Sequence, residues 1–290
     1  ALHGSTLMLP TADSLWVGKE LTRRFGLPYW QVTTSATDAN RFVLRLCRMI
    51  TGRQKVLVFN CNYHGSVDES QVEFDAQGQM IPRDGVHANG LQHQATTRLV
   101  EFNDLPALEA ALAHGDVAAV LTEPFMTNVG MVPPAPGFHD GLRELTRRYE
   151  VPLIIDETHT LSCGPGGYCG EHGLQPDFFV LGKSIAGGIP TAVWGASQAM
   201  AERIWQVLPH FQPGQAINHF GFGGTLAGNA LQMAAMRATF SEVMNEASYA
   251  HMFHLAERLR AGVEAIIHKH RLPWHVTRIG ARVEYLFMQQ

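Results

Sequence analysis

The chain has 290 residues, of which 46% are hydrophobic and 17% charged, so it can form a large core and its composition is not that of a disordered protein. Its 22 Lys and Arg against 26 Asp and Glu give a net charge of −4, which offers no electrostatic attraction to nucleic acid or to an anionic membrane. No apolar run approaches the roughly 18 residues of a membrane helix, and four cysteines are too few for a disulfide framework, so we expect a reduced, cytoplasmic protein.

Helical and strand patterns alternate along the chain. Residues 11–25 predict a helix with Leu15, Val17 and Leu21 on its buried side, and 30–34 a short strand. Residues 35–52 predict an amphipathic helix that starts with small capping residues and ends at a glycine. Short apolar runs predict buried strands at 55–59, 117–121, 151–155 and 178–181. Further helices are predicted at 105–114, 139–149, 198–208 and 243–270. This alternation is typical of an α/β fold with helices on both faces of the sheet.

Two segments between these elements are less regular. Residues 66–100 are polar and lack a clear period, so we interpret them as a surface excursion. Residues 221–229 form a glycine-rich turn into a helix, which is only a weak phosphate signal because it lacks a P-loop lysine and the GxGxxG spacing.

The domain boundary is expected near the end of the chain. A new unit begins near Trp274, and residues 282–288 have the pattern of a strand. We therefore predict a large domain at 1–273 and the truncated start of a small domain at 274–290. Because the chain begins with Ala and stops shortly after a strand, we expect a fragment that also lacks an N-terminal part.

Charged side chains follow the predicted strands directly. Asp156 follows the run 151–155, and Lys183 follows the next predicted strand, where glycines crowd around it. Other strand ends carry Tyr63, His64, Glu123 and Glu157. Open α/β sheets bind ligands outside the carboxyl ends of their strands, so Asp156 and Lys183 are expected to lie close together in an ionic site.

Three interpretations fit this pair. The first is pyridoxal 5′-phosphate (PLP), which needs a lysine amine for a Schiff base and a carboxylate that keeps its ring nitrogen protonated. Residues 35–37, at a helix N-terminus, could hold its phosphate, and Tyr63 could stack on its ring. The second is zinc, because His159, Cys163, Cys169 and His172 are suitable ligand types, although their spacing is not that of paired knuckles. The third is purely structural, with Lys183 solvated and Asp156 a cap.

A series of short stretches then points to one family. The stretches are SATDAN (35–40), TGR (51–53), YHG (63–65), EP (123–124), PPAPGF (133–138), LIIDE (153–157), PDFFVLGKSIAGGIP (177–190) and GGTLAGN (223–229). In these stretches, and from about Leu9 to Leu286, the sequence resembles the class III aminotransferases of the fold-type I PLP enzymes, a family that includes glutamate-1-semialdehyde aminomutases.

The resemblance implies a three-layer α/β/α large domain with a mainly parallel sheet. It also implies a PLP-dependent aminotransferase that moves an amino group between an amino acid or amine and a carbonyl acceptor. An intramolecular aminomutase or a racemase is the alternative within the family. A non-catalytic zinc-binding α/β protein is the alternative from another class.

The resemblance also implies roles for single residues, without a metal. Lys183 and Asp156 are the catalytic pair, as the Schiff-base lysine and the partner of the ring nitrogen. The further cofactor-contacting positions are Ser35, Ala36 and Thr37 at the phosphate, Tyr63 and His64 at the ring, and Thr158, His159 and Thr225. Glu123 is expected near the substrate.

Three of these positions carry additional implications. Thr225 matches a threonine that reaches the phosphate of a neighbouring subunit's cofactor, which implies a homodimer with shared active sites. Thr158 and His159 depart from the family, which usually has an aliphatic residue and often Gln there. A hydroxyl and an imidazole at these places are expected to influence the cofactor ring or the choice of substrate.

Overall fold

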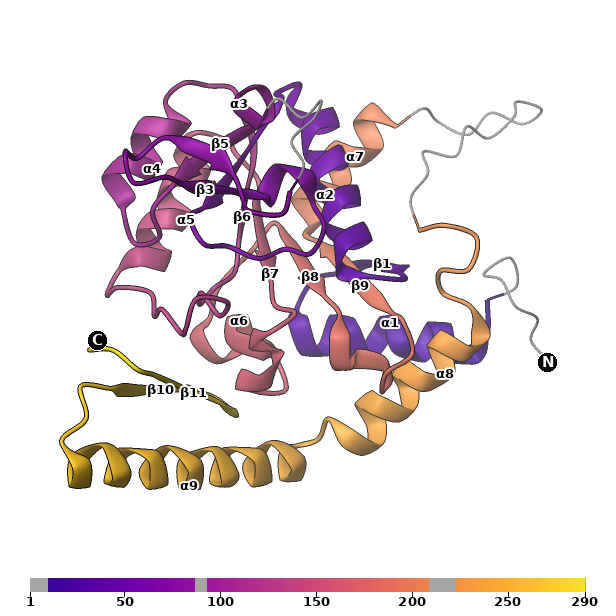
Figure 1. Cartoon of the computed structure of the whole chain (residues 1–290). Coiled ribbons are helices and arrows are strands. Elements are labelled where there is room, and N and C mark those ends of the chain that lie inside the picture. Colours follow the sequence, from indigo (N-terminus) through magenta and orange to yellow (C-terminus); the bar gives the residue numbers. More distant parts are fainter. Residues whose placement is uncertain (1–9, 87–92, 209–222, 290) are drawn as a thin grey trace, which may run out of the picture.

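The computed structural model describes residues 10–86, 93–208 and 223–289 (Figure 1). The strands are β1 (Tyr29–Thr33), β2 (Lys55–Phe59), β3 (Val72–Phe74), β4 (Met80–Pro82), β5 (Thr97–Val100), β6 (Val117–Thr122), β7 (Leu153–Asp156), β8 (Phe178–Leu181), β9 (Ala192–Ala196), β10 (His275–Ile279) and β11 (Arg282–Leu286). The helices are α1 (Ala12–Phe25), α2 (Ala36–Thr51), α3 (His93–Thr96), α4 (Leu105–Leu112), α5 (Phe138–Arg148), α6 (Gly167–His172), α7 (Gln198–Val207), α8 (Ala230–Ala238) and α9 (Glu246–His270).

Within these ranges, seven strands form one sheet in the order β1-β9-β8-β7-β6-β2-β5. The strands from β8 to β5 are parallel to their neighbours, whereas β9 is antiparallel to both β8 and β1. Asp156 at the end of β7 pairs with Val180 of β8. The carboxyl ends of these two strands therefore meet at one edge of the sheet, as the sequence predicts.

Helices cover both faces of this sheet, which confirms the predicted three-layer α/β/α architecture. Successive residues of a strand point to opposite faces. In β8, Phe179 and Leu181 pack into one core with residues of α1, α4, α5 and α8. Phe178 and Val180 pack into a second core with residues of α2 and α7. All four side chains are buried, and each stabilises the fold by about 1.5–3 kcal/mol.

The position of α2 matters most for the site. Its N-cap Ser35 accepts a hydrogen bond from the Asp38 N–H at 3.1 Å. Gly52 ends it in the left-handed conformation, at φ 69°. Ala39, Val43 and Cys47 are completely buried against the sheet. The apolar face therefore holds the helix on the sheet, with its N-terminus at the edge where β7 and β8 end.

Two of the predictions from the sequence are wrong. Residues 66–100 are not only a surface excursion, because β5 is an edge strand of the main sheet and pairs with β2. The same segment contains an antiparallel hairpin of β3 and β4. Leu15 is 65% exposed, whereas Val17 and Leu21 are buried as expected.

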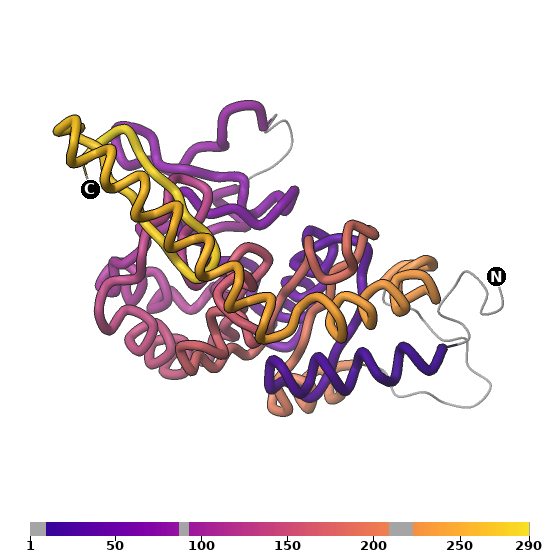
Figure 2. Tube along the Cα trace, turned by 90° about the horizontal axis from the view of Figure 1, so that it is seen from below, coloured from indigo at the N-terminus to yellow at the C-terminus, as the bar shows by residue number. Residues whose placement is uncertain are grey.

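The C-terminal elements form a separate layer. β10 and β11 pair with each other in a two-stranded sheet, and Figure 2 shows this hairpin lying along α9. Its turn docks on the large sheet domain, where the Ala281 N–H donates to the Ser162 carbonyl at 3.0 Å. The proposed boundary between residues 273 and 274 remains a prediction. No helix in the described ranges has the length and apolar content needed to cross a membrane.

Candidate active site

A cavity of about 300 Å³ lies at the carboxyl ends of the central strands. It is lined by Thr34, Ser35, Ala36, Thr37, Tyr63, His64, Gly65, Glu123, Asp156, Thr158, His159, Lys183, Gly188, Ile189, Pro190 and Thr191. The structure therefore brings every residue of the predicted site to one cavity, with the exception of Thr225. Thr225 lies on an exposed turn before α8, and its proposed contact with a partner subunit remains a prediction.

Asp156 is a buried carboxylate with three hydrogen-bond donors. His64 Nδ1 and Asn40 Nδ2 lie 3.0 and 2.9 Å from its Oδ2. The N–H of Thr158 donates to Oδ1 at 3.1 Å. Burial opposes ionisation of this group, but the hydrogen bonds, first of all from His64, outweigh burial and lower the pKa of Asp156. A stable negative charge therefore faces the cavity.

Lys183 follows β8 and Gly182 directly and has a left-handed backbone, at φ 52°. Partial burial of its ammonium group lowers the pKa of Lys183, while Asp156 and Glu123 oppose the shift. The amine is therefore neutral more often than that of a solvated lysine.

The start of α2 forms a third wall of the cavity. The first turn of a helix has N–H groups without helical partners, and its dipole favours anions. The turn that carries Tyr63 approaches this helix at Gly65, which has φ 75°. A Cβ atom there would lie 2.2 Å from Thr37 Oγ1. Only glycine therefore permits this close approach. Tyr63 lines the cavity and is 46% exposed.

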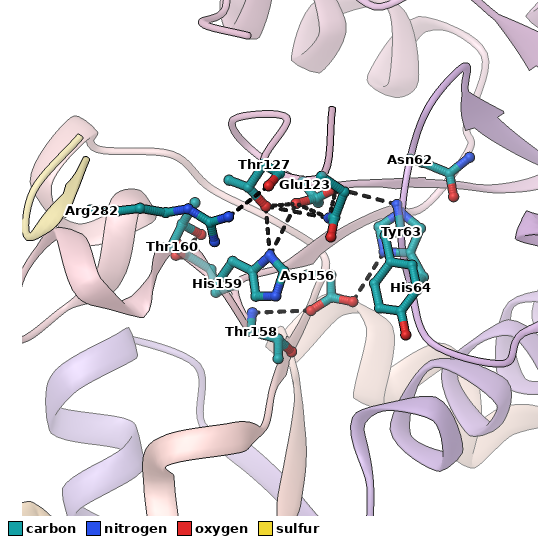
Figure 3. Close-up of polar contacts among 12 residues, drawn as sticks. Asn62, Tyr63, His64, Glu123, Thr127, Asp156, Thr158, His159, Thr160 and Arg282 are labelled. Atoms are coloured by element: carbon teal, nitrogen blue, oxygen red, sulfur yellow. Dashed lines mark hydrogen bonds and ion pairs between the residues drawn. The ribbon is translucent and has the colours of Figure 1, made fainter. Parts of the chain in front are cut away.

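Glu123, Thr127 and His159 form a chain of polar contacts along another wall (Figure 3). Thr127 Oγ1 lies 2.5 Å from Glu123 Oε2 and 2.6 Å from His159 Nδ1. Arg282 of β11 donates to the Thr127 carbonyl at 2.7 Å. Burial, followed by the nearby charges of Lys183 and Arg282, lowers the pKa of His159 to about 4. His159 is therefore neutral above that pH.

Glu157 lies outside the cavity although it follows Asp156 in sequence. It is completely buried and accepts hydrogen bonds from the N–H groups of Tyr168 and Cys169, at 2.9 and 2.5 Å. The Thr160 hydroxyl donates to it at 2.5 Å. Glu157 therefore holds the glycine-rich loop that follows β7.

The four residues of the zinc alternative are engaged elsewhere. His159 Nδ1 contacts Thr127, and the His172 ring stacks on Tyr168 with ring centroids 3.9 Å apart. Cys163 and Cys169 are buried. Across the described ranges, no group of three or more His, Cys, Asp and Glu side chains is placed to hold a metal ion. The geometry gives the zinc alternative no support.

Asn40 and Thr127 contribute to the site but were not predicted. Asn40 had a detectable signal, because it is a polar residue on the buried face of α2, and it is completely buried beside Asp156. Buried polar groups almost always have a hydrogen-bond partner. Thr127 had no such signal, since it lies in a Pro- and Gly-rich loop without periodicity.

The fold and this site place the chain in a known class. The family model for class III aminotransferases matches residues 2–285. The chain belongs to the class III aminotransferase family.

Particular relatives are more informative. The glutamate-1-semialdehyde 2,1-aminomutase of Thermomicrobium roseum is 38% identical over 262 residues, which are 88% of this chain and 58% of that protein. Two crystal structures of a glutamate-1-semialdehyde-aminomutase from Pseudomonas aeruginosa PAO1 are 82% identical, with a TM-score of 0.97 over 99% of this chain and 63% of theirs. One of them is a lysine-to-alanine variant in complex with PMP.

A more distant solved structure is also similar. An omega-transaminase from Sphaerobacter thermophilus is 28% identical, with a TM-score of 0.87 over 99% of this chain and 66% of that one. The chain therefore spans between 58% and 66% of the length of these relatives.

Proposed function

We propose that this chain carries the cofactor site of a PLP-dependent enzyme, and that the whole protein moves the amino group of glutamate-1-semialdehyde within one molecule, as a 2,1-aminomutase does. The structural observation that carries the proposal is the cavity in which Lys183 and Asp156 meet beside the N-terminus of α2. The relatives named as aminomutases, at 82% and 38% identity, support the choice of reaction.

The residues of the cavity suit PLP. The cavity volume of about 300 Å³ lies at the lower end of the range for small-molecule sites. Asp156 offers a buried negative charge, and the helix N-terminus offers N–H donors for a phosphate. The hydroxyl oxygens of Thr158 and Thr191 are buried at the cavity wall without a hydrogen-bond partner in the described residues. Such groups favour a polar ligand, because an unpaired buried hydroxyl is costly.

Each residue then has a task. When bound, PLP supplies an aldehyde carbon for an amine to attack and a ring that withdraws electrons from the substrate's Cα. Asp156 holds the negative charge that favours a protonated ring nitrogen. Lys183 Nζ would hold the cofactor at its aldehyde carbon, and the free amine would accept and return the proton of the substrate's Cα. Tyr63, at the cavity wall, would shield the ring from water.

Amino transfer between two molecules is the second candidate and the main prediction from the sequence. The omega-transaminase at 28% identity favours it, whereas the nearer relatives favour the intramolecular reaction. A racemase remains an untested alternative, and so does the homodimer with Thr225 at a shared site.

The cofactor site is tested first. PLP added to the chain should produce an absorption band above 400 nm, and borohydride reduction followed by peptide mass spectrometry should place the adduct on Lys183. Lys183→Ala should remove both signals, whereas Lys19→Ala, at an exposed lysine of α1, should keep them. An unchanged reducible adduct in Lys183→Ala would contradict the assignment.

The reaction is tested on the whole protein. Glutamate-1-semialdehyde supplied alone should yield its isomer, with the amino group moved from C2 to C1, at a rate that does not depend on an added keto acid. A reaction that requires a second amino donor or acceptor would instead favour the transaminase.

A further inference from the structure

We propose that Glu123, Thr127 and His159 form a relay that carries a proton between the cavity and the buried carboxyl group of Glu123, and that this proton sets the tautomer of His159. The relay follows from the described residues alone. Its effect on a bound cofactor rests on the proposed function, and the two are tested separately below.

The geometry allows only an indirect link between Glu123 and His159. Their nearest atoms, Oε2 and Nδ1, are 3.9 Å apart, too far for a hydrogen bond. The Thr127 hydroxyl lies between them, 2.5 Å from one and 2.6 Å from the other. Glu123 and Thr127 are 3% and 1% exposed, so water does not compete for these contacts.

A hydroxyl group has a single proton, so Thr127 can donate to only one of Glu123 and His159. Its third neighbour, Asn128 Nδ2 at 3.4 Å, is itself a donor. If it donates to an ionised Glu123, it must accept from His159, which then carries its proton on Nδ1. If Glu123 is protonated and donates to Thr127, the hydroxyl donates to Nδ1, and the proton of His159 sits on Nε2. Each state of Glu123 therefore fixes one tautomer of a neutral His159.

The other contacts of Glu123 determine which oxygen takes part. The N–H of Tyr63 donates to Oε1 at 3.3 Å, and the side-chain amide of Asn128 lies nearer to Oε1, at 3.3 Å, than to Oε2, at 3.5 Å. An added proton is therefore favoured on Oε2, which faces Thr127. Along this path a proton binds at Nε2, the Nδ1 proton passes to Thr127, and the hydroxyl proton passes to Glu123. One proton is gained in total, and each N–H or O–H bond that breaks is replaced by another.

His159 connects this relay to the cavity. It lines the cavity, and in the described part of the chain its Nε2 has no hydrogen-bond partner. With Glu123 ionised, Nε2 accepts a hydrogen bond from a ligand N–H or O–H. With Glu123 protonated, Nε2 donates to a ligand oxygen. The relay therefore determines which polar groups this wall accepts.

The surrounding charges permit both the ionised and the protonated state of Glu123. The titratable or charged groups that act on Glu123 or His159 are His64, Asp156, Lys183 and Arg282, and Glu284 pairs with Arg282. Burial raises the pKa of Glu123, with Asp156 in the same direction and His64 opposing. Since the pKa of His159 is lowered to about 4, Glu123 takes up its proton first as the pH falls.

The relay is tested by NMR on the PLP-free 290-residue chain with ¹⁵N-labelled histidine. The His159 signals are assigned with His159→Gln. As the pH falls towards 4, the protonated ring nitrogen should change from Nδ1 to Nε2. The same midpoint should appear in the infrared absorption of protonated carboxyl groups, and Glu123→Gln should remove the component that has this midpoint.

Variants separate the relay from a general change in the cavity. Glu123→Gln should hold His159 as the Nε2–H tautomer at every pH above its own titration, because the amide can donate permanently to Thr127. Thr127→Val should abolish the pH-dependent change, and Thr127→Ser should retain it. Thr191→Val, which removes another buried hydroxyl of the same cavity, should behave as wild type.

A tautomer that stays the same across the pH range in wild type would overturn the proposal, and so would a pH-dependent change that survives in Thr127→Val. If Glu123→Gln fails to fold, the two Thr127 variants still decide. Failure of PLP binding would refute the proposed function and leave these measurements valid. Where PLP binds, its absorption spectrum should change with pH at the midpoint of the relay in wild type, and not in Thr127→Val.

Discussion

Substitutions at Asp156 and Glu157, the acidic pair at the end of β7, should separate effects on stability from effects on cofactor binding. Glu157 is completely buried and faces three donors, whereas Asp156 lines the cavity. We predict that Glu157→Gln lowers the free energy of unfolding and leaves PLP affinity nearly unchanged. Asp156→Asn should weaken PLP binding instead.

The contacts of Glu157 give the magnitude. One oxygen accepts from Tyr168 and Thr160, and the other accepts from Cys169. A glutamine can replace only one of these oxygens, so the Cys169 N–H loses its acceptor at a cost of about 1–3 kcal/mol. Glu157→Ala leaves all three donors unpaired and creates a cavity, so we expect a loss of more than about 3 kcal/mol.

Urea unfolding followed by circular dichroism measures the free energy of unfolding. Titration of absorbance with PLP measures the PLP affinity. For Asp156→Asn, loss of a charge-assisted interaction worth about 1.5–3 kcal/mol predicts roughly 10- to 150-fold weaker PLP binding. The reasoning is refuted if Glu157→Gln unfolds at the wild-type urea concentration, or if it loses as much PLP affinity as Asp156→Asn.

Three further predictions follow from single contacts. Gly65→Ala should weaken PLP binding and destabilise the fold by more than Gly26→Ala. Both glycines have φ 75°, but only a Cβ at position 65 meets another atom within 4 Å. Equal losses of unfolding free energy in the two variants, measured with urea, would contradict this. The lowered pKa of Asp156 means that its stabilisation is present above the unfolded value of 3.8 and is lost as the pH falls through the folded value. The difference in the free energy of unfolding between wild type and Asp156→Asn should therefore change with pH only in acid. A change near neutral pH would count against this prediction. Gly280→Ala should release the β10–β11 hairpin, because its Cβ would lie 2.4 Å from the Cys163 Cα; unchanged proteolysis of the C-terminus would argue otherwise.

The parts of the fold that the sequence predicts well are those with one dominant local signal. α2 has an N-cap, a regular apolar face and a terminal glycine, and its predicted and observed bounds nearly coincide. β2 and β8 are short runs that are apolar except for Lys55 at the start of β2, and both match the prediction residue for residue. β5 was missed because it lies at the sheet edge, where only Thr97 and Val100 are buried and no apolar run results.

The same distinction applies to the site: residues at strand ends could be predicted, and contacts between loops could not. Asp156 and Lys183 could be placed together because parallel strands deliver their carboxyl ends to one edge. The contact between Thr127 and His159 could not, because it joins two loops that follow different strands. Arg282 approaches the same place from β11, more than a hundred residues later in the chain. Such contacts depend on how loops pack, which no local pattern encodes.

The acidic pair shows where a sequence pattern becomes ambiguous and how the surrounding residues resolve it. Adjacent residues at a strand end point in opposite directions, so one of Asp156 and Glu157 was bound to leave the cavity, and the pattern does not say which. The glycine-rich loop after the pair settles the question. A Cβ at Gly167, which has φ 67°, would lie 2.9 Å from Glu157 Oε2. The loop therefore needs glycine because it wraps around the Glu157 carboxylate, and the cavity is left to Asp156.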